Sequence, residues 1–119
     1  MTISTLHLGL AWAVGALAAV LAILAALGLR TGSMPRAVTD LLVVAVGASV
    51  LGNMLIGMGF VAGGELPANP LHGIFAAVVL VALPVARTWR GLADAPSPKL
   101  MLVAASAVIV ALVGLNQSG

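Results

Sequence analysis

Four long apolar runs make up most of the chain, and short stretches that contain glycine and proline separate them. The runs cover residues 4–29, 36–61, 70–86 and 98–115. Each run is close to the ~20 residues that an α-helix needs to cross a hydrocarbon core of about 30 Å. The pattern therefore predicts an all-α membrane protein, with four transmembrane helices in a single domain over residues 1–119.

The separating stretches are short, so consecutive helices are expected to lie side by side and antiparallel, in an up-down-up-down bundle. In such a bundle the first and third helices run in the same direction and lie diagonally across the core. Asn69 before Pro70 and Ser97 before Pro98 are expected to cap the third and fourth helices. Their side chains can accept hydrogen bonds from the free backbone amides of a first helical turn.

Composition supports the membrane assignment and excludes several classes of protein. Hydrophobic residues make up 62% of the chain and charged residues 7%, whereas soluble domains carry about 25% charged residues. The absence of cysteine excludes disulfides, thiolate metal sites and thiol catalysis. No charged residue lies near the middle of an apolar run, so a proton-coupled transporter would lack its coupling group. With so few charges, nucleic-acid binding is not expected.

The charged residues predict how the chain crosses the membrane. All five basic residues fall in or beside the first and third connections: Arg30, Arg36, Arg87, Arg90 and Lys99. Because basic residues are enriched on the cytoplasmic side, both termini are expected outside, in a multi-pass protein of a bacterial or archaeal plasma membrane. The acidic residues Asp40, Glu65 and Asp94 lie in or beside connections and are expected to be solvated.

The chain has two histidines, His7 and His72, each near the start of one of the two parallel helices. They are therefore expected at similar depth on diagonal helices near the outer face. Two imidazoles in this arrangement can fill both axial positions of a haem iron. The small residues Ala11, Gly15 and Ala76 follow at helical spacing and would leave room for a porphyrin. We expect a haem b with the histidines as metal ligands.

Other assignments of these polar and sulfur-containing residues are possible. The histidines can instead be interfacial side chains that bind no ligand. On α-helical spacing, the side chain of Val79 in the third apolar run is predicted to face the lipid. Ser49 and Asn53 lie one turn apart and are expected to hydrogen-bond between helices. Met54 and Met58 are also one turn apart, and thioethers suit Cu(I). Methionine more commonly fills gaps between helices, so copper is not expected.

Three short segments resemble one four-helix half of the haem A synthase family. Residues 53–64 read Asn-Met-Leu-Ile-Gly-Met-Gly-Phe-Val-Ala-Gly-Gly and precede Leu-His-Gly-Ile-Phe-Ala at 71–76. In the family, a helix ending in Gln-x-x-x-Gly precedes an outer loop and a helix that opens with His-x-x-x-Ala. Residues 6–11, Leu-His-Leu-Gly-Leu-Ala, are similar to the family's other haem-ligand helix. The resemblance implies a haem-holding bundle.

The chain also departs from that family. No glutamate precedes His7, no arginine follows it closely, and the outer cysteine pair of many bacterial members is missing. Haem A synthesis is therefore not implied. The sequence favours a small cytochrome b subunit that transfers electrons within a larger respiratory or photosynthetic membrane complex, and that is not an enzyme by itself. A homo-oligomer is the other expected assembly. The alternative function is a cofactor-free structural accessory subunit of such a complex.

Overall fold

The computed structural model describes residues 2–64, 71–89, 91 and 94–118. Four helices form it: α1 (Ile3–Thr31), α2 (Arg36–Ala62), α3 (Leu71–Thr88) and α4 (Pro98–Ser118). They begin and end within a few residues of the four apolar runs. All four are long and apolar enough to cross a membrane, which confirms the predicted all-helical class and is compatible with a multi-pass membrane protein.

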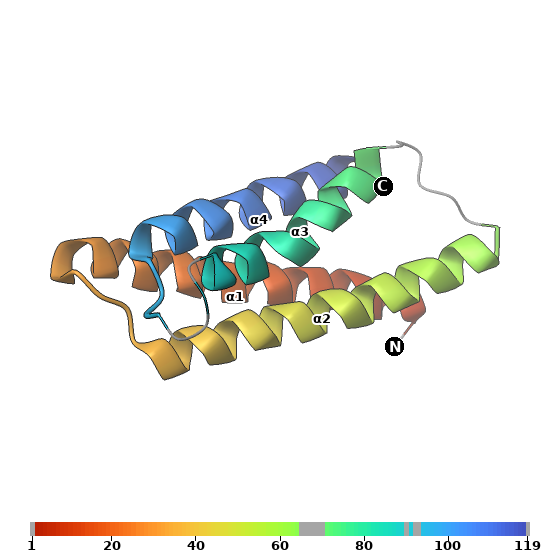
Figure 1. Cartoon of the computed structure of the whole chain (residues 1–119). Helices are drawn as coiled ribbons and strands as arrows, with labels where there is room; N and C mark the ends of the chain where they lie inside the picture. Colours follow the sequence, from red (N-terminus) through yellow and green to blue (C-terminus); the bar gives the residue numbers. More distant parts are fainter. Residues whose placement is uncertain (1, 65–70, 90, 92–93, 119) are drawn as a thin grey trace.

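Consecutive helices run antiparallel, and each packs beside two others (Figure 1). The neighbouring pairs are α1 with α2, α2 with α3, α3 with α4, and α4 with α1. Among the described residues, no Cα atom of α1 comes within 8 Å of one in α3, so these two helices are diagonal as predicted. We call the end where α1 and α3 begin the histidine end, and the opposite end the arginine end.

The buried core fills the arginine end and the middle of the bundle and stops short of the histidine end. Among described residues, the outermost buried positions are Val14 on α1, Val50 on α2, Val79 on α3 and Ala111 on α4. The apolar core consists of Val14, Ala18, Leu21, Ala25, Met34, Val43, Val46, Val50, Val79, Leu83, Met101, Ala104, Ala105, Val108 and Ala111. Every described side chain beyond these positions toward the histidine end is half-buried or exposed.

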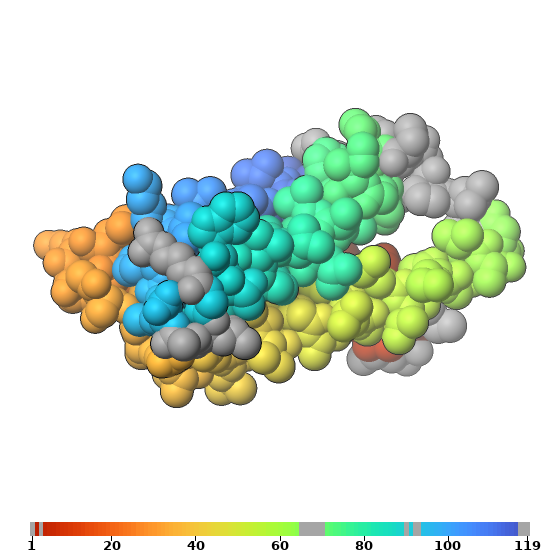
Figure 2. Space-filling view, viewed as in Figure 1, coloured from red at the N-terminus to blue at the C-terminus, as the bar shows by residue number. Residues whose placement is uncertain are grey.

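The reason for this uneven packing lies in the contact between α3 and α4. The ring of Phe75 on α3 lies directly on Gly114 of α4, and a Cβ at position 114 would be 2.8 Å from two ring carbons. The glycine therefore lets α3 approach α4 closely at the histidine end. Figure 1 shows that α3 stays beside α4 at this end, whereas the end of α2 diverges from α3. In the space-filling view (Figure 2), an opening separates the start of α3 from the end of α2.

The arginine end is closed by tight local contacts. A Cβ on Gly28 would lie 2.9 Å from Cγ of Met34, so only glycine lets the first connection fold back onto α1. Ser97 accepts a hydrogen bond from the amide of Leu100 at 3.3 Å, which confirms the predicted cap of α4. The predicted cap at Asn69 lies outside the described residues. The buried core thus reaches the arginine end of the bundle and stops short of the histidine end.

Gly114→Ala is expected to destabilise the bundle by about 1–3 kcal/mol, because the added methyl overlaps the Phe75 ring and overpacks the α3/α4 contact. The matched control is Gly47→Ala in α2, where an added Cβ meets no atom within 4 Å. That control should be neutral or stabilising by up to ~1 kcal/mol, since alanine favours helix more than glycine does. Unfolding by SDS in mixed micelles, followed by circular dichroism, measures both. Equal stability of the two variants would contradict this packing.

Candidate functional site

His7 lies in the second turn of α1 and packs against α2. Its ring meets the ring of Phe60 edge-on, with centroids 5.6 Å apart and planes at 89°. Its Cε1 atom lies 3.8 Å from the place where a Cβ on Gly57 would be. The side chain is half-buried, and its Nδ1 atom is buried without a hydrogen-bond partner among the described residues. An added Cβ at position 57 would thus be in ordinary van der Waals contact with the imidazole, so the ring lies beside this part of α2.

His72 is the second residue of α3 and is also half-buried. Because α1 and α3 both begin at the histidine end, the two imidazoles belong to the same end of the bundle. They come from the diagonal pair of helices, whose described Cα atoms all lie more than 8 Å apart. The end of the bundle that lies beyond the buried core therefore carries both histidines.

The three small residues predicted to make room for a cofactor are all half-buried. A Cβ on Gly15 would lie 3.7 Å from Cδ1 of Leu112, so this part of α1 faces α4. Ala11 and Ala76 lie nearer the histidine end, beyond the last buried positions of their helices. The predicted outward orientation of Val79 is wrong, because its side chain is only 3% exposed. Val79 is the outermost member of the buried stripe of α3.

One polar side chain continues the core-facing stripe of α2. The buried positions of that helix are Thr39, Val43, Val46 and Val50. The same alternation of three and four residues leads next to Asn53 and then to Gly57, where an added Cβ would lie 3.8 Å from Cε1 of His7. The Oδ1 atom of Asn53 is buried and has no hydrogen-bond partner among the described residues. This oxygen therefore does not make the hydrogen bond between helices that the sequence predicted.

The chemistry available at the histidine end is that of two imidazoles in apolar surroundings. No group of three or more His, Asp or Glu side chains that could hold a bare metal ion occurs in the described parts of the chain. A haem needs only two axial ligands from the protein, because the porphyrin supplies the other four. The donor set fits that requirement. Met54 packs against the core, whereas Met58 is 64% exposed, so the two thioethers lie in different surroundings.

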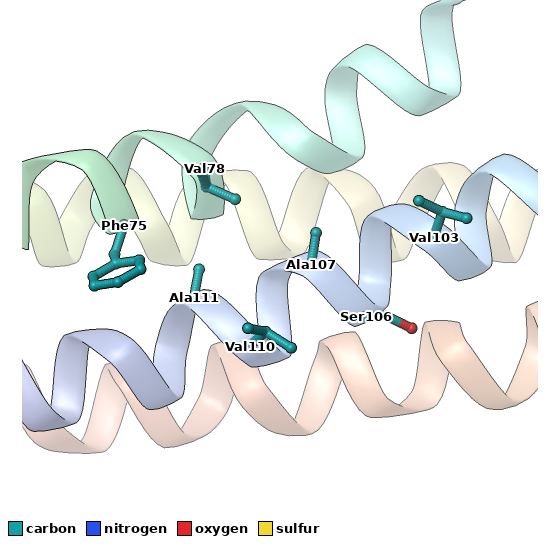
Figure 3. Close-up of a pocket in the computed structure, with 7 residues that line it drawn as sticks. All are labelled: Phe75, Val78, Val103, Ser106, Ala107, Val110 and Ala111. Atoms are coloured by element: carbon teal, nitrogen blue, oxygen red, sulfur yellow. The ribbon is translucent and has the colours of Figure 1, made fainter. Parts of the chain in front are cut away.

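A separate groove lies on the outside of the bundle, between α3 and α4 (Figure 3). Its walls are apolar apart from one hydroxyl, and neither histidine lines it. The lining residues are Phe75, Val78, Val103, Ser106, Ala107, Val110 and Ala111. The groove is open to the surroundings of the bundle and holds no group suited to bind iron. The candidate site is therefore taken to be the histidine end, to which both imidazoles belong.

Sequence analysis missed an ion pair at the opposite end. Arg87 on α3 is 5% exposed and donates hydrogen bonds from Nε and Nη2 to the carboxylate of Asp40 on α2. Its Nη1 donates to the backbone carbonyl of Asp94 at 3.1 Å. The Asp40 side chain is still partly solvated, as predicted, because 42% of it is exposed, but it is also the counter-charge of a buried guanidinium, which the sequence analysis did not predict. One feature of the sequence could have indicated that Arg87 is buried: Val79, Leu83 and Arg87 are spaced four residues apart, which places them on one face of α3.

This ion pair lies far from the histidines but holds together two of the helices that border the candidate site. It joins α2, α3 and the third connection at the arginine end, which is where α2 and α3 lie together. At the histidine end the same two helices diverge (Figure 2). The opening is therefore bounded by helices that are fixed to each other at their far ends.

Comparison with known proteins identified no relative. No protein-family model matches the chain, and neither the curated proteins nor the solved structures contain a match. The resemblance to haem A synthases thus rests on the short segments quoted above.

Asp40→Asn is expected to destabilise the bundle by about 1–3 kcal/mol, because the buried guanidinium of Arg87 then keeps its charge without a full counter-charge. The value lies below that of a fully buried pair, since the Asp40 side chain is 42% exposed. Asp94→Asn is the matched control: the backbone carbonyl of Asp94 accepts from Arg87, and the change leaves that carbonyl in place, so it should cost little. SDS-induced unfolding compares them. A control as unstable as Asp40→Asn would refute this assignment.

Proposed function

We propose that this chain is a small membrane cytochrome b subunit that holds one haem b at the histidine end. The observation that carries the proposal is the end of the buried core before the level of the histidines. The side chains at the level of the histidines are half-buried or exposed, so a group bound there would not have to displace closely packed core side chains. His7 and His72 belong to the two diagonal helices at this level, and α2 and α3 diverge beside them (Figure 2).

In this proposal each side chain has a defined task. His7 and His72 act as neutral imidazole ligands to the iron, and both axial positions are then filled. A haem so ligated supplies reversible one-electron transfer and has no open position for oxygen. Ala11 and Ala76 keep the interior free of bulky groups. Within the described residues the histidine end has no Arg or Lys that would pair with the propionates of a bound haem.

The surroundings of the proposed subunit follow from its surface and its charges. Large apolar side chains are exposed on all four helices, as is suitable for contact with lipid and with a larger membrane complex. The basic side chains at the arginine end favour the cytoplasmic side for that end. The termini and the haem then lie toward the outer face of a bacterial or archaeal plasma membrane. The resemblance to one half of a haem A synthase agrees with a haem-b-holding bundle.

The visible spectrum of the purified, haem-reconstituted protein tests the proposal. We expect a Soret band and a sharp reduced α-band typical of low-spin haem. His7→Ala and His72→Ala should each abolish the low-spin form, because either change leaves the iron five-coordinate or unbound. Leu8→Ala, beside His7 and exposed, should retain the full spectrum. Absence of haem from the wild-type protein would favour the cofactor-free accessory subunit instead.

The space available for haem is tested by adding bulk beside His72. Ala76→Leu should lower haem occupancy roughly 5- to 100-fold, as expected if overpacking of 1–3 kcal/mol falls on the loaded form alone. Ala77→Leu is the control, since Ala77 is exposed whereas Ala76 is half-buried. Haem content per protein is measured for both in one detergent. Equal and full occupancy would mean that no macrocycle lies against this face of α3.

A further inference from the structure

Both tryptophans of the chain lie on the outside of the bundle, and they belong to opposite ends of it. Trp12 on α1 is 75% exposed, and Trp89, directly after α3 at the arginine end, is 71% exposed. Tryptophan is enriched where a bilayer meets water, because its ring is apolar and its indole N–H needs a polar partner. The two side chains are therefore suited to mark the two boundaries of the hydrocarbon layer of a membrane.

The spacing along α1 and α3 agrees with this role. Trp12 lies 18 positions from Arg30, and Leu71, the first residue of α3, lies 18 positions from Trp89. At 1.5 Å per residue each interval is about 27 Å, which is close to a hydrocarbon layer of about 30 Å. The side chain of Trp12 also leans toward the start of α1, because Cα–Cβ bonds in a helix tilt toward its N-terminus. The indole is thereby directed toward the histidine end.

The four helices extend unequally beyond this boundary. In α4 the same interval leads from Pro98 to Asn116, which is polar and exposed and lies two residues before the helix ends. In α2 it leads from Arg36 to position 54, and the helix continues over residues 55–62. α1 likewise includes residues 3–11 beyond Trp12. Figure 1 shows the end of α2 reaching past the start of α3. We call residues 3–11 and 55–62 together the α1/α2 tip.

The α1/α2 tip is the part of the hairpin best suited to leave the hydrocarbon layer. Its two helical segments pack on each other through the rings of His7 and Phe60, whose centroids are 5.6 Å apart. Ser4 and Thr5 are exposed on it, whereas residues 21–29, at the other end of α1, contain no polar side chain. Polar groups cost free energy in hydrocarbon. This asymmetry favours a position in which the start of α1, and not its end, lies outside.

We propose that the hydrocarbon layer of the membrane ends at the level of Trp12, and that the α1/α2 tip stands in the lipid headgroup layer beyond it. A headgroup layer adds roughly 5–8 Å on each side, so the nine residues of α1, about 13 Å long, pass through it to the water. Exposed apolar side chains of the tip, such as Leu8 and Met58, remain among lipid headgroups there. His7 lies five positions beyond Trp12 and is therefore open to the aqueous side. The inference rests on the membrane placement in the proposed function and not on haem.

The depth of each tryptophan is measured by fluorescence quenching of the haem-free full chain in liposomes whose lipids carry bromine at a shallow or a deep acyl position. Trp89→Phe leaves Trp12 as the emitter, and Trp12→Phe leaves Trp89. We expect the shallow bromine to quench both more than the deep one. The control is Val20→Trp in a chain that carries both phenylalanine substitutions, because Val20 is 45% exposed and lies eight positions nearer the middle. The deep bromine should quench this control more.

Cysteine labelling tests the tip itself, and the chain has no cysteine of its own. Leu8→Cys and Met58→Cys replace exposed side chains of the tip, and Val20→Cys and Val44→Cys replace exposed side chains of the same two helices between the boundaries. In nanodiscs, which leave both faces accessible, a charged maleimide should label the tip variants at least about tenfold faster, because hydrocarbon excludes the reagent and disfavours the reactive thiolate. Circular dichroism checks that each variant is helical.

Every outcome bears on the proposed boundary. Quenching of Trp12 that matches the Val20→Trp control, or labelling of Leu8→Cys as slow as that of Val20→Cys, places the start of α1 in hydrocarbon and overturns the inference. A Val20→Trp control that is not quenched more by the deep bromine means that the bundle does not span the bilayer, which overturns it too. If the depths are as expected and the protein takes up no haem, the haem-binding function fails and the boundary stands. A haem-loaded protein with a deep Trp12 gives the reverse result.

Discussion

The close packing of α4 against both α1 and α3 is the constraint on which the other features depend. Helices in a bilayer gain little from the hydrophobic effect when they associate, so close van der Waals contact between small residues dominates. On α4 these residues include Ala104, Ala105 and Ala111, all buried, and Gly114, on which Phe75 lies. Three helices are thereby fixed as a unit, and α2 is placed by its contacts with α1 and α3 alone.

The position of α2 explains why the two ends of the bundle differ. At the arginine end the buried guanidinium of Arg87 requires a counter-charge, and Asp40 on α2 supplies it. The helices must therefore meet there. At the histidine end no described ion pair joins α2 to α3, and α3 instead follows α4 through the Phe75 contact. A closed end and an open end result from the same four helices, and the open end is the one with both histidines.

The polar residues His7 and Asn53 at the open end share one property. His7 and Asn53 are placed where an apolar residue would improve packing in a membrane bundle, and both retain a buried atom without a described partner. Natural sequences deviate from efficient packing mainly where function demands it. The proposed haem site draws on these features, together with the two imidazoles on separate helices and their small neighbours.

The sequence by itself determined the number, extent and order of the helices, because length, hydropathy and turn residues are read along the chain. It also determined that His7 and His72 come to one end on diagonal helices, because short connections force antiparallel neighbours. It did not determine which face each helix turns inward. Nearly every position is apolar, so periodicity gave no reliable direction, and Val79 was assigned to the wrong side. The pairing of Arg87 with Asp40 joins residues far apart in the chain. The position of His7 beside Gly57 depends on the tilt of α2 relative to α1. Only the tertiary structure decided these, because close packing between helices selects the rotation of each one.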